Sequence, residues 1–155
     1  MKKNNSELPL RMDRFERICR DAGVKLTRQR LEIFRELALT EDHPDAEAIY
    51  RRVRTKLPQV SLDTVYRTLW MLNDLGLIDT LGQAHDRTRF DANLNHHHHF
   101  ACVRCGLIRD FYSDDLDRLN VRDAIRDVGE ASSLHLEVRG LCHECIKRKM
   151  EEEKT

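Results

Sequence analysis

The chain has 155 residues, with 27 basic and 27 acidic side chains and a formal net charge of zero, which argues against a strongly basic nucleic-acid-binding protein. The charge is uneven, because residues 1–90 carry 17 basic and 14 acidic side chains (+3) and residues 91–155 carry 10 and 13 (−3). No run of 18 apolar residues predicts a membrane span, and the charged residues 1–5 lead into no secretory signal. We therefore expect a cytoplasmic protein with reduced cysteines and no membrane partner.

Helical periodicity dominates the first 75 residues. Apolar side chains recur at three- and four-residue spacing and predict helices over residues 11–22, 28–39, 46–56 and 62–75. Thr27, Asp45 and Ser61 precede the last three helices and are typical N-cap residues. Gly23 and Gly76 are placed to end the first and the fourth helix.

After Gly76 the apolar period shortens to two, which predicts strands over residues 77–81 and 88–91 joined by a turn at 82–87. Several helices followed by a small hairpin are typical of a winged helix-turn-helix domain. We therefore predict an α+β protein with such a domain over residues 1–91. A small α/β domain would occupy residues 92–155, beginning with a polar linker at 92–95.

The second domain is expected to alternate strands and helices. Strands are predicted over residues 100–102, 107–111 and 134–139, and an amphipathic helix over 114–128. A short charged helix should follow the last cysteine pair.

Four of the five cysteines form two Cys-x-x-Cys pairs, namely Cys102, Cys105, Cys142 and Cys145. Two such pairs in one small domain favour a tetrahedral structural Zn²⁺ site. One pair alone could instead be redox-active, and His143 could compete as a ligand, although it lies inside the turn. Cys19 stands alone and is expected to pack as a small apolar residue.

A run of four histidines, residues 96–99, leads directly into the first cysteine pair. Alternate residues of a strand face opposite sides, so His97 and His99 can project together while His96 and His98 face the other way. A His-x-His pair with carboxylates suits Fe²⁺, Mn²⁺ or Zn²⁺. The run therefore predicts a second metal site.

From about residue 25 to 146 the sequence resembles the ferric uptake regulator (Fur) family. The pieces that carry the resemblance are LTRQR (26–30), HP (43–44), SLDTVYRTL (61–69), RFD (89–91), HHHFACVRCG (97–106) and GLCHEC (140–145). Each piece alone is weak, but their order and spacing together are specific.

The resemblance implies a regulatory Fe²⁺ or Mn²⁺ site between the two domains, held by His43, Asp91, His97, His99 and Asp110. Taken alone, His43 reads as a turn residue before a proline and Asp91 as a linker charge. Many family members have a third site, but the histidine it needs falls here at Leu134, and His135 lies on the opposite face of its strand. We therefore leave a third site, which would involve His96, His98 or His135, out of the prediction.

The helix that begins after Ser61 is expected to enter the major groove of double-stranded DNA. Its exposed N-terminal half carries the candidate contacts Ser61, Thr64, Tyr66, Arg67 and Thr68. Arg87 and Arg89 would touch the DNA backbone or minor groove from the wing. An ordinary amphipathic helix would show the same apolar face.

These features predict a dimeric, metal-dependent repressor of palindromic operators rather than an enzyme, with no organic substrate. Asp110 resembles the peroxide-sensing branch of the family, which implies that peroxide oxidises His43 and His97 at the iron-loaded site. An iron- or zinc-responsive regulator is the alternative. A metallo-hydrolase is disfavoured because five protein ligands leave little room for a substrate.

Overall fold

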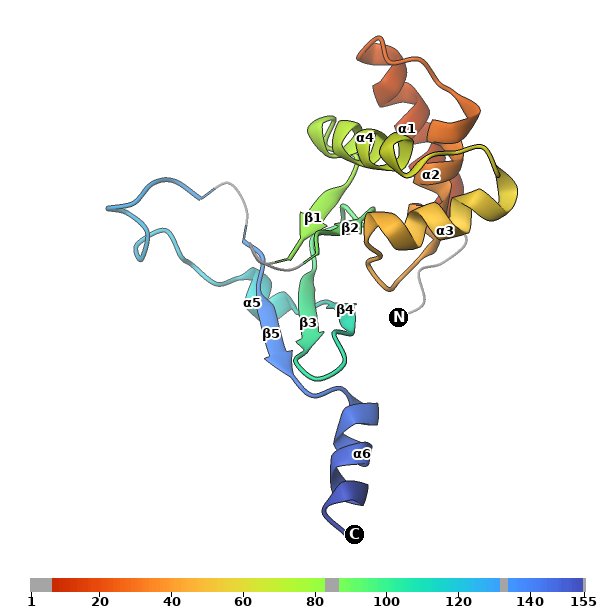
Figure 1. Cartoon of the computed structure of the whole chain (residues 1–155). Coiled ribbons are helices and arrows are strands. Elements are labelled where there is room, and N and C mark those ends of the chain that lie inside the picture. The colour runs from red at the N-terminus through yellow and green to blue at the C-terminus, as the bar shows by residue number, and fades with distance from the viewer. Residues whose placement is uncertain (1–6, 83–86, 132–133, 155) are drawn as a thin grey trace. The chain divides into compact units, whose positions relative to one another are not determined.

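The computed structural model describes residues 7–82, 87–131 and 134–154. The chain divides into two compact units, residues 1–94 and residues 95–155, which are described separately (Figure 1). Most of the turn expected at residues 82–87 lies outside the described residues. No described helix is both long and apolar enough to cross a membrane.

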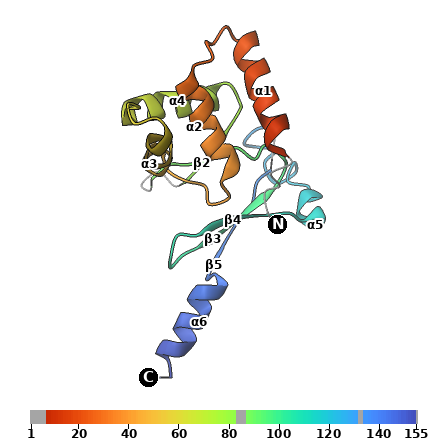
Figure 2. The same cartoon turned by 90° about the vertical axis from the view of Figure 1, so that its right-hand side faces the viewer.

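Four helices make up most of the first unit over residues 7–82. Their bounds are α1 (Leu8–Asp21), α2 (Arg28–Leu39), α3 (Ala46–Lys56) and α4 (Leu62–Asp74). The helix α2 packs against α1, α3 and α4 (Figure 2). Phe15 of α1 stacks on Phe34 of α2 with ring centroids 4.7 Å apart, and both rings are buried. Cys19 is fully buried beside them, and this burial raises the pKa of its thiol, so it packs as the apolar residue that we expected.

The predicted helix ends are confirmed. The side chains of Thr27, Asp45 and Ser61 accept hydrogen bonds from backbone amides in the first turns of α2, α3 and α4. Gly23 and Gly76 have φ angles of 68° and 67°, a left-handed conformation that glycine adopts without a steric penalty. Local capping chemistry therefore sets where these helices begin and end.

A small wing follows α4. Strands β1 (Asp79–Leu81) and β2 (Arg89–Asp91) pair antiparallel, with Phe90 opposite Thr80. The segment before α3 joins them, because the Phe90 amide donates to the Pro44 carbonyl at 3.1 Å and Asp45 bridges to Arg89. Residues just before α3 are thereby fixed to the wing.

The described residues of the second unit form a three-stranded sheet and two helices. Its elements are β3 (His98–Cys102), β4 (Ile108–Phe111), α5 (Asp114–Asp117), β5 (Glu137–Gly140) and α6 (His143–Glu152). Strand β3 lies in the centre, antiparallel to β4 and parallel to β5. The helix α6 continues from the end of β5 (Figure 2).

Two predictions for the second unit were wrong. The helix expected over residues 114–128 ends at Asp117 and continues as turns, and the strand expected from residue 134 begins only at Glu137. Leu119 and Val128, two apolar residues of the expected amphipathic helix, are 49% and 89% exposed. An amphipathic face stabilises a helix only when a partner surface buries it, and the described part of this unit offers none.

Candidate functional site

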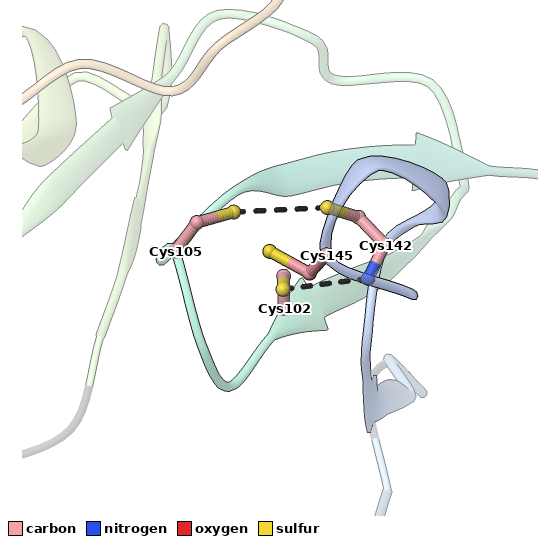
Figure 3. A group of neighbouring side chains, drawn as sticks. All are labelled: Cys102, Cys105, Cys142 and Cys145. Carbon is pink, nitrogen blue, oxygen red and sulfur yellow. Dashed lines mark hydrogen bonds between the residues drawn. The ribbon is translucent and has the colours of Figure 1, made fainter. Parts of the chain in front are cut away.

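The four paired cysteines come together at one end of the second unit. Cys102 ends β3, Cys105 lies in the following turn, Cys142 caps α6 and Cys145 lies in its first turn (Figure 3). Their sulfur atoms all lie within 4.8 Å of one another, and those of Cys105 and Cys142 are 3.7 Å apart. Four sulfurs at about 2.3 Å from a tetrahedral zinc ion would be about 3.8 Å apart. The cluster therefore has the size of a zinc site.

Backbone hydrogen bonds shape this cluster. Gly106, with a φ angle of 73°, closes the first turn by donating its amide to the Cys102 carbonyl at 3.0 Å. The Val103 amide donates to the Gly140 carbonyl at 2.9 Å, which ties the turn to the end of β5. The sheet thus brings together two cysteine pairs that have 36 residues between them in the sequence.

The electrostatics of the cluster also suit a cation. Backbone amides, first that of Cys105 and then that of Cys142, donate to the Cys102 sulfur and lower its pKa to about 6. Burial and the neighbouring thiols raise the pKa of Cys145 to about 12. One thiolate is therefore favoured, but several together repel one another unless a cation neutralises them.

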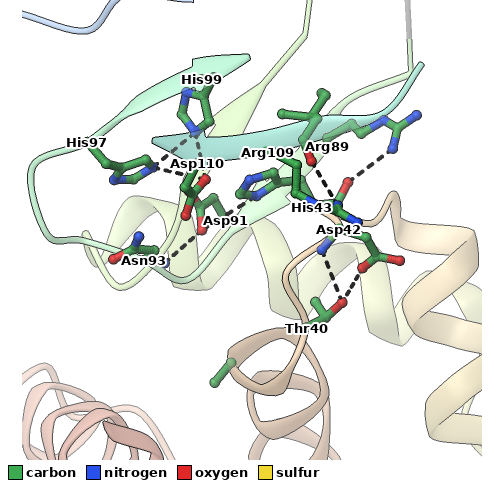
Figure 4. Close-up of polar contacts among 12 residues, drawn as sticks. Thr40, Asp42, His43, Arg89, Asp91, Asn93, His97, His99, Arg109 and Asp110 are labelled. Atoms are coloured by element: carbon green, nitrogen blue, oxygen red, sulfur yellow. Dashed lines mark hydrogen bonds and ion pairs between the residues drawn. The ribbon is translucent and has the colours of Figure 1, made fainter. Parts of the chain in front are cut away.

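On one face of the sheet, His97, His99 and Asp110 point toward one another (Figure 4). The strand register places Asp110 of β4 directly opposite His99 of β3. The Nε2 atoms of the two histidines are 3.0 Å apart, and each lies 3.5 Å from Oδ1 of Asp110. The expected pairing of His97 with His99 on one face is confirmed, and these three side chains converge on one point.

The hydrogen bond of His97 determines which of its nitrogens can bind a metal. Nδ1 donates to the backbone carbonyl of Asn95 at 2.5 Å, so the proton of the neutral ring resides on Nδ1. Nε2, the atom turned toward His99 and Asp110, then carries a lone pair. Metal-binding histidines typically donate their other ring nitrogen in this way.

In the first unit, His43 and Asp91 form a second buried pair (Figure 4). His43 belongs to the segment fixed to the wing, and Asp91 ends β2. Nδ1 of His43 lies 3.6 Å from Oδ1 of Asp91, too far for a hydrogen bond. Two ligand atoms at about 2.1 Å from one ion would be about 3–4 Å apart. The spacing therefore suits a shared cation.

A third cluster lies on the other face of β3. Nε2 of His96 and Nε2 of His98 lie 2.9 Å and 2.8 Å from Oδ1 of Asp117. The three side chains are close enough to share an ion, and the ring of His135 lies 5.7 Å from that of His96. The sequence analysis left this group aside because His135 was expected on the opposite face of its strand, but residue 135 precedes β5 and its ring lies on the side of His96.

His98 is nevertheless bonded differently from His97. Its Nδ1 accepts the Leu136 amide at 3.3 Å, so the ring proton resides on Nε2, which donates to Asp117. A metal on Nε2 would have to displace that proton, while Nδ1 already serves as an acceptor. Hydrogen bonds therefore account for the arrangement of this cluster.

The expected DNA-facing residues of α4 do not all face solvent. Tyr66 is 42% exposed, and the Arg67 side chain is 81% exposed beside Asp63 at 2.9 Å. The hydroxyls of Ser61 and Thr64 are hydrogen-bonded to each other at the start of the helix. Thr68 differs from the expectation, because it is only 4% exposed and faces the core.

Trp70 was not singled out from the sequence, although it is 44% exposed on the same helix. It lies four residues after Tyr66 and so on the same face of α4. From the sequence, an aromatic residue in the second half of an amphipathic helix is expected to be buried in the core. The exposure of Trp70 becomes visible only in the folded structure.

Comparisons with known proteins agree with this geometry. The sequence pattern of the "Ferric uptake regulator family" matches residues 21–139. The peroxide-responsive repressor PerR of Staphylococcus epidermidis is 36% identical over 128 residues, which cover 81% of this chain and 84% of that protein.

Solved structures are similar along most of the chain. The ferric uptake regulator Fur of Helicobacter pylori aligns with a TM-score of 0.75 and 25% identity, covering 90% of this chain and 93% of that one. A zinc-bound manganese uptake regulator aligns with a TM-score of 0.65 and 31% identity, covering 82% and 97%. The chain belongs to the ferric uptake regulator family.

Proposed function

We propose that this protein is a metal-dependent transcriptional repressor that binds palindromic operator DNA as a homodimer. The observation that carries the proposal is the convergence of His97, His99 and Asp110 on one point, with the His97 ring held so that Nε2 can bind a metal. The exposed Tyr66 and Arg67 on α4 supply the DNA-reading side chains. Thr68 has no part in this reading, because it is buried.

Two metal ions per chain are proposed. Cys102, Cys105, Cys142 and Cys145 hold a structural Zn²⁺, which fills its coordination shell with four sulfurs and leaves no position for a substrate. His43 and Asp91 of the first unit, with His97, His99 and Asp110 of the second, together hold a regulatory Fe²⁺ or Mn²⁺.

Such a shared ion would couple metal binding to DNA binding. Ligands from both units can engage one ion only in conformations that bring their donor atoms together, so the ion favours those conformations. A dimer fits a palindromic operator only when its two reading helices have the right spacing. Metal binding would thus raise the population of the DNA-competent dimer.

The signal is proposed to be hydrogen peroxide. A bound Fe²⁺ would supply the redox chemistry that activates peroxide beside its ligands and would end in the oxidation state in which it began. One oxygen atom of the peroxide would be inserted into a ring C–H bond of His43 or His97, and the other would leave as water. An oxidised ring is a weaker ligand, so the metal bridge opens and DNA is released. An iron- or zinc-responsive regulator with the same ligands is the alternative.

The test compares Fe²⁺-, Mn²⁺- and Zn²⁺-loaded protein in gel shifts with and without brief peroxide exposure, with peptide masses measured in parallel. We expect only the Fe²⁺ form to lose DNA, together with a gain of one oxygen on His43 or His97. Oxidised cysteines beside unmodified histidines would show a thiol-based sensor instead. Retained DNA with no modification would favour the iron- or zinc-responsive alternative, and turnover of hydrolytic substrates would favour a metallo-hydrolase.

A further inference from the structure

A pocket of about 120 Å³ opens within the first unit, between the helix α4 and the wing strand β2. Tyr66 and Trp70 line it from the helix, and Phe90 lines it from the wing. Thr88 and the charged side chains of Arg87, Asp45 and Glu47 complete the lining. The pocket is therefore aromatic along α4 and β2 and polar or charged elsewhere.

The aromatic side of the pocket is held in place by packing. The rings of Trp70 and Phe90 pack edge to face, with centroids 6.0 Å apart and an interplanar angle of 78°. Phe90 is buried, so its ring position is fixed by the core. Trp70 remains 44% exposed and Tyr66 42% exposed, one helical turn apart. Two large apolar rings are thus displayed on the helix face proposed to read DNA.

The charged side of the pocket is an arginine shared by two carboxylates. A guanidinium nitrogen of Arg87 lies 3.3 Å from an oxygen of Asp45 and 3.0 Å from one of Glu47. Asp45 also caps α3 by accepting from the Ala48 amide at 2.8 Å, so its position is fixed. Glu47 is exposed and has no capping hydrogen bond in the described structure. Of its two carboxylate partners, Arg87 can therefore release Glu47 more readily than Asp45 when another anion binds.

The place of the pocket indicates what it would meet on DNA. In a winged-helix protein the reading helix enters the major groove while the wing touches the adjacent backbone or minor groove. The strand of backbone that separates two neighbouring grooves then crosses the space between helix and wing. That backbone presents an apolar deoxyribose face and an anionic phosphate, which match the aromatic rings and the arginine.

We propose that this pocket binds one deoxyribose-phosphate unit of the operator backbone. This proposal rests on the proposed DNA-binding function. The rings of Trp70 and Tyr66 pack against the sugar, and the Arg87 guanidinium leaves Glu47 to pair with the phosphate. Glu47 is then a positioning residue: it holds the arginine in the absence of DNA and opposes binding by competing with the phosphate. Sequence-independent affinity is thereby kept low until the reading helix contributes its own contacts.

Trp70 provides a direct test, because it is the only tryptophan in the chain. Acrylamide quenching of its fluorescence is measured on the metal-loaded full-length protein with and without duplex operator DNA. We expect DNA to lower the quenching constant several-fold, since the sugar covers the exposed ring. A gel shift on the same samples shows whether DNA is bound.

The outcomes separate the two proposals. Bound DNA with an unchanged quenching constant would overturn the pocket assignment and leave the repressor function standing. A wild-type protein that binds no duplex DNA with any metal would overturn both. Trp70→Phe should keep most of the affinity, whereas Trp70→Gln should lower it on operator and random DNA alike.

The role of Glu47 is tested by charge variants. Glu47→Gln should bind both operator and random DNA about two- to fivefold more tightly, the effect expected of one exposed ion pair. Glu36→Gln is the matched control, because it removes the same charge from an ion pair with Lys56 and lies outside the pocket. Arg87→Gln should reduce the slope of log affinity against log salt by about 0.9, one phosphate contact.

The double variant Glu47→Gln/Arg87→Gln decides whether Glu47 acts through the arginine. We expect it to lose the gain in affinity that Glu47→Gln shows alone. A gain that persists without Arg87, or one that Glu36→Gln matches, would mean that only the total charge matters and would overturn the proposal.

Discussion

At the scale of single residues, two adjacent histidines illustrate how a hydrogen bond selects a ligand. His97 donates through Nδ1 to a carbonyl, whereas His98 accepts an amide at Nδ1 and donates through Nε2. Both rings are buried, His98 as the first residue of β3 and His97 directly before it, and they face different carboxylates, Asp117 and Asp110. Only His97 therefore presents an Nε2 lone pair toward other potential ligands.

His97→Gln and His98→Gln should separate these roles. We expect His97→Gln to lose the regulatory divalent metal while keeping zinc. His98→Gln should keep the regulatory metal but lose about 1–3 kcal/mol of stability, because it leaves buried polar groups without their partners. Mn²⁺ titration by calorimetry and thermal unfolding measure the two effects. Equal loss of Mn²⁺ affinity in both variants would contradict the assignment.

Arg67 and Thr68 are also neighbours with different exposure, 81% for the arginine side chain and 4% for the threonine. Arg67→Ala should weaken operator binding by about 1–3 kcal/mol if the arginine reads a base. Thr68→Val is the control and should leave DNA affinity unchanged, because the buried side chain cannot reach DNA. Fluorescence anisotropy with operator and random duplexes measures both. An equal loss of affinity for the operator and the random duplex would show that Arg67 contacts only a phosphate.

At the scale of elements, the sequence predicts helix starts correctly where a capping residue lies directly before the helix. The capped helices α2, α3 and α4 matched their predicted starts, because Thr27, Asp45 and Ser61 act on adjacent amides. The alternation of the histidine run likewise follows from strand geometry. The fold class and the cysteine cluster could therefore be predicted from the sequence.

The remaining features depend on contacts that are distant in the sequence. The apolar spacing in residues 114–128 is helical, yet α5 stops after one turn because none of the described residues buries the side chains that follow it. The orientation of His98 depends on the Leu136 amide, 38 residues away. The exposure of Trp70 depends on Phe90 of the wing. The periodicity of nearby residues carries no information about these long-range contacts, so the sequence analysis did not predict the three features.

The zinc cluster gives a prediction for the elements that it joins. Cys145→Ser should release zinc and destabilise the second unit, because the cluster fastens β3 to α6 and few buried apolar side chains replace it. Cys19→Ala is the control, since that thiol is buried in the helical core of the first unit. Metal analysis, thermal unfolding and gel filtration measure the result. A zinc-loaded, folded dimer of Cys145→Ser would contradict the clamp.

At the scale of the whole molecule, the proposed metal content is two ions per chain. The cysteine cluster accounts for one, and the five histidine and aspartate ligands account for the other. The hydrogen bonds of His98 argue against a third ion on the remaining cluster. Mass spectrometry of the native protein loaded with excess Mn²⁺ should show one zinc and one manganese. If a third ion is found and His98→Gln removes it, metal binding replaces the hydrogen bonds of His98 and the assignment is wrong.

The length of the side chain at position 110 should decide the response of the whole molecule to peroxide. Asp110 reaches 3.5 Å from both His97 and His99, and a glutamate there would carry its carboxylate about one methylene further toward the proposed ion. A longer carboxylate can bind through both oxygens and occupy the position that peroxide needs. We expect Asp110→Glu to keep metal-dependent DNA binding but to retain DNA after peroxide treatment of the Fe²⁺ form. His43 and His97 should then gain less oxygen than in the wild type under the same exposure. Asp117→Glu, on the opposite face of β3, is the control and should keep the wild-type peroxide response. If the Asp110→Glu protein is oxidised and releases DNA as fast as the wild type, residue 110 does not control the access of peroxide to the metal.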